Sequence, residues 1–109
     1  MRSALIAAGL CLGLAATASA QDAKVAKGQQ LFVDQKCTLC HSIGDKGNKK
    51  GPLDDVGSKL STAQIHSWVT DPKGMTAKTK ATRKPEMKSY TLAKDDVDAL
   101  VAYLSTLKK

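Results

Sequence analysis

The sequence predicts an all-α fold of three main helices joined by long loops. Apolar residues recur at helical spacing in three segments, most clearly in the last 19 residues of the chain. No segment shows the strict alternation of apolar and polar residues that indicates a half-buried strand. Two stretches between the helical segments, residues 43–58 and 73–90, contain Gly and Pro and show no period, which is typical of loops.

The first 20 residues have the features of a secretory signal peptide. Arg2 gives a positive start, residues 5–16 form an apolar or small run, and Ala18-Ser19-Ala20 is a small-residue cleavage site. The apolar run is too short to span a bilayer, and the cleavage site disfavours a retained anchor. We therefore expect residues 1–20 to be removed during export to the periplasm, with no stable membrane insertion, leaving one domain over residues 21–109.

Small size and positive charge narrow the functions of this domain. Small domains bury little apolar surface and often rely on a disulfide, a metal or a cofactor. The formal net charge is +7, of which Arg2 in the signal contributes one. Because nucleic acid is not a partner outside the cytoplasm, acidic protein surfaces or anionic membranes remain as partners for the basic chain.

The first helix is predicted over residues 22–35. Val25, Leu31 and Phe32 give it an apolar face, and Asp22 is a candidate N-cap. Gly28 inside a helix costs about 1 kcal/mol relative to alanine, so we expect a packing reason for it, such as the close approach of a second helix.

The second helix is predicted over residues 61–70. Ser61 and Gln64 have the spacing of a capping box, and Ile65, Trp68 and Val69 share one face. Asp71-Pro72 is expected to end this helix.

The last segment, residues 91–109, has the strongest helical pattern. Thr91 is a candidate cap, and acidic and basic residues stand at the ends that suit the helix dipole. The apolar stripe consists of Val97, Leu100, Val101 and Leu104.

The chemistry of the chain is concentrated in Cys37-Thr38-Leu39-Cys40-His41. If Cys11 leaves with the signal, Cys37 and Cys40 are the only cysteines of the mature domain. A thioredoxin-like redox pair would need a βαβ context, which the sequence lacks. A zinc site needs four ligands, and only His41 and the distant His66 are available besides the thiols. A disulfide over this spacing closes too short a loop to restrict the unfolded chain much.

Covalent haem attachment is the interpretation that remains, because C-x-x-C-H is its known signature. Residues three apart lie on one side of a helical turn, so both sulfurs can bond one edge of a flat ring. The histidine that follows can reach the iron. We therefore predict that Cys37 and Cys40 hold one haem c and that His41 is its proximal ligand.

The chain resembles a class I c-type cytochrome, a small soluble electron carrier with one haem, over essentially the whole mature domain. The matching residues are Gly28 and Phe32, the Cys37–His41 motif, Gly51-Pro52, Trp68 with Asp71-Pro72, Met87, and residues 98–104. The resemblance implies a cytochrome c-like fold around the haem. It also implies that the first and last helices cross at Gly28, against Leu100, Val101 or Leu104.

The resemblance implies further site residues. A methionine in the loop before the last helix is the second iron ligand in the family, and Met87 stands at that place. Met75 is the other candidate, and we expect it to fill a gap in the core or to be exposed. Pro85 precedes Met87 by two positions, whereas in the family a proline often follows the methionine directly. The carbonyl of Pro52 is expected to accept the ring N–H of His41.

Two residues of the second helix have weaker assignments. Trp68 is either a core residue or a contact of a haem propionate through its indole N–H. We expect His66 to lie on the surface and not to bind the iron.

Charge indicates the kind of partner. Lysines and one arginine dominate residues 73–88 around Met87, against the single acid Glu86, and three more lysines follow the haem-binding motif. This distribution predicts transient docking on an acidic face of an oxidase, dehydrogenase or reductase by a monomeric carrier.

The predicted function is therefore periplasmic electron transfer by a protein that is not an enzyme. The alternatives are a haem enzyme or gas sensor with an open iron position, and an electron-transfer subunit of a larger dehydrogenase.

Overall fold

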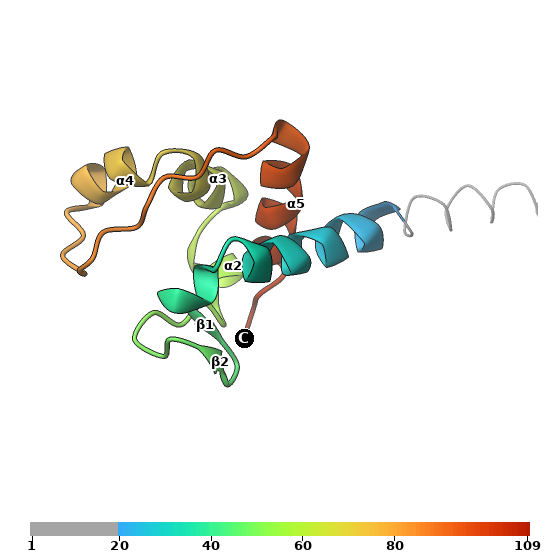
Figure 1. The fold of residues 1–109 in the computed structure, drawn as a ribbon, viewed down its shortest axis with the longest axis horizontal. Helices are drawn as coiled ribbons and strands as arrows, with labels where there is room; N and C mark the ends of the chain where they lie inside the picture. Colours follow the sequence, from blue (N-terminus) through green and yellow to red (C-terminus); the bar gives the residue numbers. More distant parts are fainter. Residues whose placement is uncertain (1–19) are drawn as a thin grey trace, which may run out of the picture.

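The computed structural model describes residues 20–109 (Figure 1). The predicted signal peptide and Cys11 lie outside the described residues, apart from Ala20. An N-terminal helix covers residues 20–34. The elements that follow are the 3₁₀ turn η1 (Cys37–Leu39), strands β1 (Ser42–Ile43) and β2 (Lys46–Gly47), and helices α2 (Val56–Lys59), α3 (Thr62–Thr70), α4 (Pro72–Thr79) and α5 (Lys94–Ser105). The predominantly helical fold confirms the predicted fold class.

The core lies where α5 meets α3 and the N-terminal helix. The predicted apolar stripe of α5 is buried, and Ile65 and Val69 of α3 belong to the same apolar cluster. Phe32 of the N-terminal helix is also buried there, and its ring meets that of Tyr103 edge to face, with centroids 6.2 Å apart. The periodicity of the sequence therefore identified the buried faces correctly.

Gly28 has the packing reason that the sequence predicted, but with different neighbours. A Cβ at Gly28 would collide with the carbonyl oxygen of Ala99 and would lie 2.6 Å from Cβ of Tyr103. The nearest atoms therefore belong to Ala99 and Tyr103 and not to the predicted neighbours Leu100, Val101 or Leu104. Ala99 and Tyr103 are four residues apart and share one face of α5, where the small Ala99 lets the two helix backbones approach each other.

The second predicted helix is confirmed as α3, with its capping box. The Ser61 hydroxyl accepts from the Gln64 N–H at 3.1 Å, and the Gln64 side chain accepts from the Ser61 N–H at 2.8 Å. Pro72 follows the end of α3, as predicted, but it also occupies the first turn of α4, a helix that the sequence pattern did not reveal. Proline suits that position because its missing N–H would have no partner there. The Asp71 side chain caps α4 by accepting from the Gly74 N–H at 3.1 Å.

The predicted N-caps of the first and the last helix were both wrong. Asp22 lies inside the N-terminal helix, since residue 20 is already helical. Helix α5 begins at Lys94, and Ala93 occupies its N-cap position without a side-chain hydrogen bond, so Thr91 is not the cap. Asp95 and Asp96 nevertheless lie in the first turn, where they favour the helix dipole.

Three short elements lie within or overlap the stretch expected to be only a loop, residues 43–58. Strands β1 and β2 pair antiparallel, with Ser42 opposite Gly47 and Ile43 opposite Lys46. Gly44, at φ 60°, permits the tight connection between them. Helix α2 follows, and its Gly57 N–H donates to the carbonyl of Leu107 at 2.8 Å, which ties the end of the chain to this region. Within residues 20–109, no helix has the length and apolar character needed to cross a membrane.

Candidate functional site

The two cysteines lie on one tight turn that follows the N-terminal helix. Lys36 adopts a left-handed conformation (φ 58°) and separates that helix from η1. The N–H groups of Cys40 and His41 both donate to the Cys37 carbonyl, at 3.2 and 2.9 Å. Cys37 is buried and Cys40 half-buried, and neither forms a disulfide. The turn therefore presents two unpaired thiols, followed at once by a histidine.

The alternatives to haem attachment find little support in this geometry. In the described part of the chain, no group of three or more His, Cys, Asp or Glu side chains lies close enough together to hold a metal ion, as a zinc site would require. The cysteine pair follows a helix, whereas a thioredoxin-like pair follows a strand.

His41 is oriented by a backbone carbonyl. Its Nδ1 lies 3.0 Å from the carbonyl oxygen of Gly51, to which it donates. Burial lowers the pKa of His41, and the charge of Arg83 lowers it further, against the opposing effect of the Gly51 carbonyl. The imidazole is therefore neutral near pH 7, with its proton on Nδ1 and the lone pair of Nε2 available to a metal.

The carbonyl of Gly51, and not that of Pro52, holds His41, so the predicted acceptor was wrong by one residue. The Gly51 carbonyl also accepts from the Ser42 N–H at 3.1 Å, and the Leu53 N–H donates to the Ser42 carbonyl at 2.9 Å. These two bonds form a short parallel bridge between Ser42 and Pro52, which fixes the direction of the backbone at residues 51–53. Because successive carbonyls of an extended chain point to opposite sides, the Pro52 carbonyl points away from Ser42.

The segment that carries Met87 meets the site at two places, Gly51 and Cys37. On one side, a Cβ at Gly51 would collide with the guanidinium of Arg83. On the other, the Tyr90 hydroxyl lies beside the Cys37 sulfur, and burial together with that neighbour raises the pKa of Tyr90 to about 12. Burial raises the pKa of Cys37 as well, although the Tyr90 hydroxyl partly offsets this. Met87 is half-buried and stands between these two contact points in the sequence.

The remaining predicted residues lie farther along the chain. Met75 is half-buried in α4, where its N–H donates to the Asp71 carbonyl at 3.0 Å. Trp68 is half-buried on α3, on the same side as Ile65 and Val69, and its contact with a propionate stays a prediction. His66 is exposed, as expected.

Sequence patterns gave no indication of three residues that lie against the cysteine turn or against Gly51. These are Tyr90, Arg83 and Asn48, whose amide bridges two parts of the turn region. No motif marks them, since each reaches the turn from a distant part of the chain or from a loop without a period.

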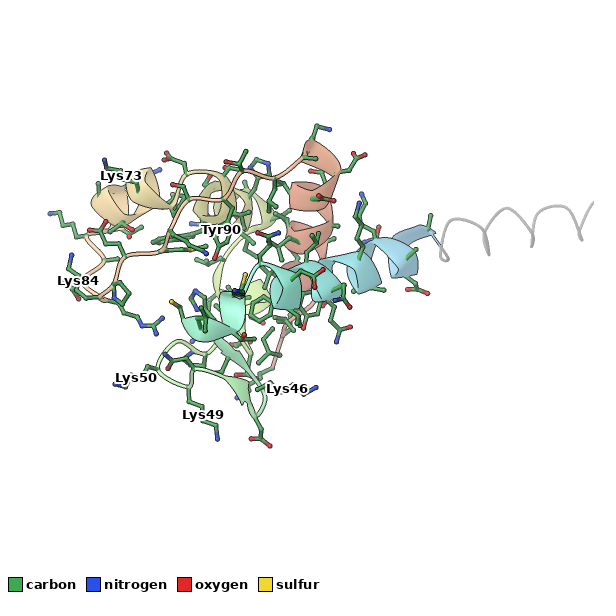
Figure 2. All side chains as sticks on the ribbon, viewed as in Figure 1. Lys46, Lys49, Lys50, Lys73, Lys84 and Tyr90 are labelled. Atoms are coloured by element: carbon green, nitrogen blue, oxygen red, sulfur yellow. The ribbon has the colours of Figure 1, made fainter. Side chains whose placement is uncertain are left out.

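Positive charge gathers around the cysteine turn and the Met87 loop. Figure 2 shows Lys46, Lys49 and Lys50 around the β1–β2 hairpin, and Lys73 and Lys84 at the end of the molecule that carries α4. All five are exposed. Their ion pairs, such as Lys84 with Glu86 at 3.3 Å, are solvent-exposed and therefore weak, so they do not hold the lysines in place.

The residues at the turn fit a covalently attached haem. Such a group needs two free thiols, one imidazole nitrogen for the iron and apolar surroundings. Cys37 belongs to the same apolar cluster as Phe32, with Tyr90 and Leu92 packed against it. The Nδ1–H···O=C bond leaves Nε2 of His41 free, the arrangement expected of a metal-binding histidine.

Comparison with known proteins agrees with this chemistry. The model of the cytochrome c family matches residues 25–108. A curated relative, cytochrome c oxidase subunit 2 of Alkalihalophilus pseudofirmus, is 28% identical over 91 residues, which cover 75% of this chain and 25% of the relative. The chain thus spans about a quarter of the length of that relative. No solved structure matches the chain significantly. Because the family match covers well over half of the chain and includes the C-x-x-C-H turn, the chain belongs to the cytochrome c family, as its resemblance to class I c-type cytochromes implied.

Proposed function

We infer that the protein transfers electrons through a haem, since it belongs to the cytochrome c family. We propose that the protein is a periplasmic electron carrier, and not an enzyme, that cycles between Fe(II) and Fe(III). Cys37 and Cys40 hold one haem c covalently, and His41 and Met87 are the axial ligands of its iron. When bound, the haem supplies one-electron redox chemistry, whereas the protein supplies attachment, orientation and shielding from water.

The observation that carries this proposal is that the Met87 loop meets both the cysteine turn and the Gly51 segment that orients His41. Arg83 packs at Gly51 and Tyr90 at Cys37, and Met87 lies between them in the sequence. A loop that meets the site at two places restricts where its central residue can lie. Methionine together with histidine raises the reduction potential relative to two histidines, since a thioether favours ferrous iron. The proposed carrier therefore has a fairly positive potential.

The proposed partner is an acidic docking face on an oxidase, dehydrogenase or reductase, which binds a monomeric carrier transiently. The exposed lysines near the turn support this, because complementary charge speeds association more than it strengthens binding. Similarity to part of an oxidase subunit supports an oxidase as the acceptor. The same similarity supports a second candidate, in which the domain performs this transfer within a larger complex.

An optical spectrum of the purified holoprotein tests the ligand set. We expect low-spin spectra in both redox states and, in the oxidised protein, the weak red band that arises from a methionine sulfur on ferric iron. Addition of carbon monoxide to the reduced protein should change nothing within minutes. A high-spin ferrous form that binds carbon monoxide at once would overturn the carrier proposal in favour of an enzyme or sensor.

Two methionine variants identify the ligand. Met87→Ala is expected to remove the red band and to lower the reduction potential by on the order of 0.1 V, a part of the roughly 0.8 V range that axial ligands span. Met75→Ala is the matched control, because it removes the same side chain from α4 and should keep the band. Loss of the band in Met75→Ala alone would show that the assignment is wrong.

A further inference from the structure

Asn48 donates hydrogen bonds to the backbone carbonyls at the C-terminal end of the cysteine turn. Its backbone N–H donates to the carbonyls of Thr38 and His41, at 3.0 and 3.1 Å, and its side-chain Nδ2 donates to the Leu39 carbonyl at 3.1 Å. The last carbonyls of a short helix have no partner within the helix. Asn48 therefore satisfies the two carbonyls that lie between Cys37 and Cys40 in the sequence.

Asn48 also holds the segment that orients His41. Its side-chain Oδ1 accepts from the Lys50 N–H at 3.0 Å, and its carbonyl accepts from the Gly51 N–H at 3.2 Å. The carbonyl of Gly51 in turn accepts the Nδ1–H of His41 at 3.0 Å. One residue thus connects the cysteine turn to the carbonyl that fixes the imidazole.

The bonding pattern explains why an amide stands at this position. Asparagine and glutamine offer an N–H donor and a carbonyl acceptor on one planar amide, and the shorter asparagine can bond a backbone N–H two residues further on. Gly47 lets the backbone before Asn48 approach the His41 carbonyl, because a Cβ at position 47 would collide with that carbonyl oxygen. The φ of 99° at Gly47 also disfavours other residues.

We propose that Asn48 is the positioning residue of the haem-attachment turn, which holds Cys37, Cys40 and the Gly51 carbonyl in one fixed arrangement. The inference rests on haem binding by this family, but it depends neither on Met87 as a ligand nor on the partner. Without the Asn48 amide, the turn loses the restraint on its Leu39 carbonyl, and the 48–51 segment loses the restraint on the Lys50 N–H. The imidazole of His41 is then less firmly oriented.

Two variants of Asn48 distinguish the side-chain bond to the Leu39 carbonyl from the side-chain bond to the Lys50 N–H. Asn48→Ala removes both side-chain bonds. Asn48→Asp keeps an acceptor for the Lys50 N–H but places a carboxylate oxygen against the Leu39 carbonyl. Gln30→Ala is the matched control, because it removes an exposed amide bond of 2.9 Å to Asp34 on the N-terminal helix.

The experiment measures covalent haem content by mass and, in the haem-bearing fraction, the solvent exchange of the His41 Nδ1 proton by NMR. Since only chains that have folded around haem enter the second measurement, a general loss of folding does not affect it. We expect both Asn48 variants to contain less haem than the wild type. We expect exchange in Asn48→Ala to be about five-fold faster, the factor that corresponds to the net free energy of one hydrogen bond. Gln30→Ala should match the wild type in both measurements.

Full haem content and unchanged exchange in both Asn48 variants would overturn the inference. A defect confined to Asn48→Ala would also overturn it, because the turn at residues 48–50 alone would then matter and not the bond to Leu39. A wild-type protein that contains no haem would instead refute the proposed function, and this outcome is visible before any variant is compared.

Discussion

The helical core and the site region are held together in different ways. The helical core consists of the N-terminal helix, α3 and α5, which interlock through buried apolar side chains such as Phe32 and Leu100. The site region consists of residues 36–55 and 80–93. Its first part is held mainly by backbone and amide hydrogen bonds around His41, Asn48 and Gly51, and its second part reaches the first through Arg83 and Tyr90. Stability therefore resides chiefly in the first region and chemistry in the second. Because apolar burial is the larger stabilising term, the site can retain thiols and an imidazole without loss of the fold.

The largest effect is expected in the core when a leucine is replaced by alanine, and the same substitution can be made in the site region for comparison. Leu100 is 3% exposed on α5, whereas Leu39 is 68% exposed between the two cysteines. Leu100→Ala should lower the free energy of unfolding by about 3 kcal/mol, since it leaves a cavity in the core. Leu39→Ala should change it by less than about 0.5 kcal/mol. Denaturant unfolding of the holoproteins measures both, and similar losses would show that the two regions do not differ as described.

Replacing one glycine in each region by alanine compares how tightly the backbone is packed in the helical core and in the site region. Gly28→Ala should cost about 2 kcal/mol of unfolding free energy, because the new methyl group meets the Ala99 carbonyl and forces the two helices apart. Gly44→Ala should cost about 1 kcal/mol, since nothing lies within 4 Å and only its φ of 60° is unfavourable. Thermal unfolding of the two variants at equal pH and salt provides the measurement. A larger loss at Gly44 would contradict the proposed packing.

Charge variants test the site region as a docking surface. Lys50→Gln and Lys84→Gln should each lower the rate of electron transfer to an acidic partner by about two-fold at low salt, since exposed lysines steer association. Lys24→Gln on the N-terminal helix makes the same charge change and should have a smaller effect. The differences should disappear near 0.5 M salt, where the Debye length is only about 4 Å. Stopped-flow kinetics at several ionic strengths would detect them, and a rate independent of salt would refute charge-steered docking.

The smallest effect concerns the carboxyl that ties the chain end to the start of α2. The Lys109 N–H donates to Asp55 at 2.8 Å, and this bond, followed by the Ser58 side chain, lowers the pKa of Asp55. A carboxyl with a lowered pKa in the folded state stabilises the protein above its unfolded pKa of about 3.9. That contribution is lost as the pH falls through the lower folded value. Asp55→Asn should therefore flatten the pH dependence of stability slightly below pH 4, as acid titration of the unfolding midpoint would reveal. An unchanged slope would mean that the bond contributes nothing.

The sequence by itself determined the parts that depend on short-range patterns. Apolar residues three and four positions apart identified the buried faces of α3 and α5, and the spacing of Ser61 and Gln64 identified a real capping box. The same holds for Cys37, Cys40 and His41, because their chemistry is a property of adjacent residues. A local pattern suffices wherever the interacting groups lie within one helical turn.

The tertiary structure decided everything that depends on which segments meet. Only the crossing of the helices shows that Gly28 faces Ala99 and Tyr103, and only the bridge at Ser42 directs the Gly51 carbonyl toward His41 in place of that of Pro52. The role of Asn48 likewise depends on the β1–β2 hairpin, which brings it back to Leu39, nine positions earlier in the sequence. The physical reason is that a carbonyl direction or a close backbone contact is set by the path of the whole chain, which no periodic pattern of side chains records.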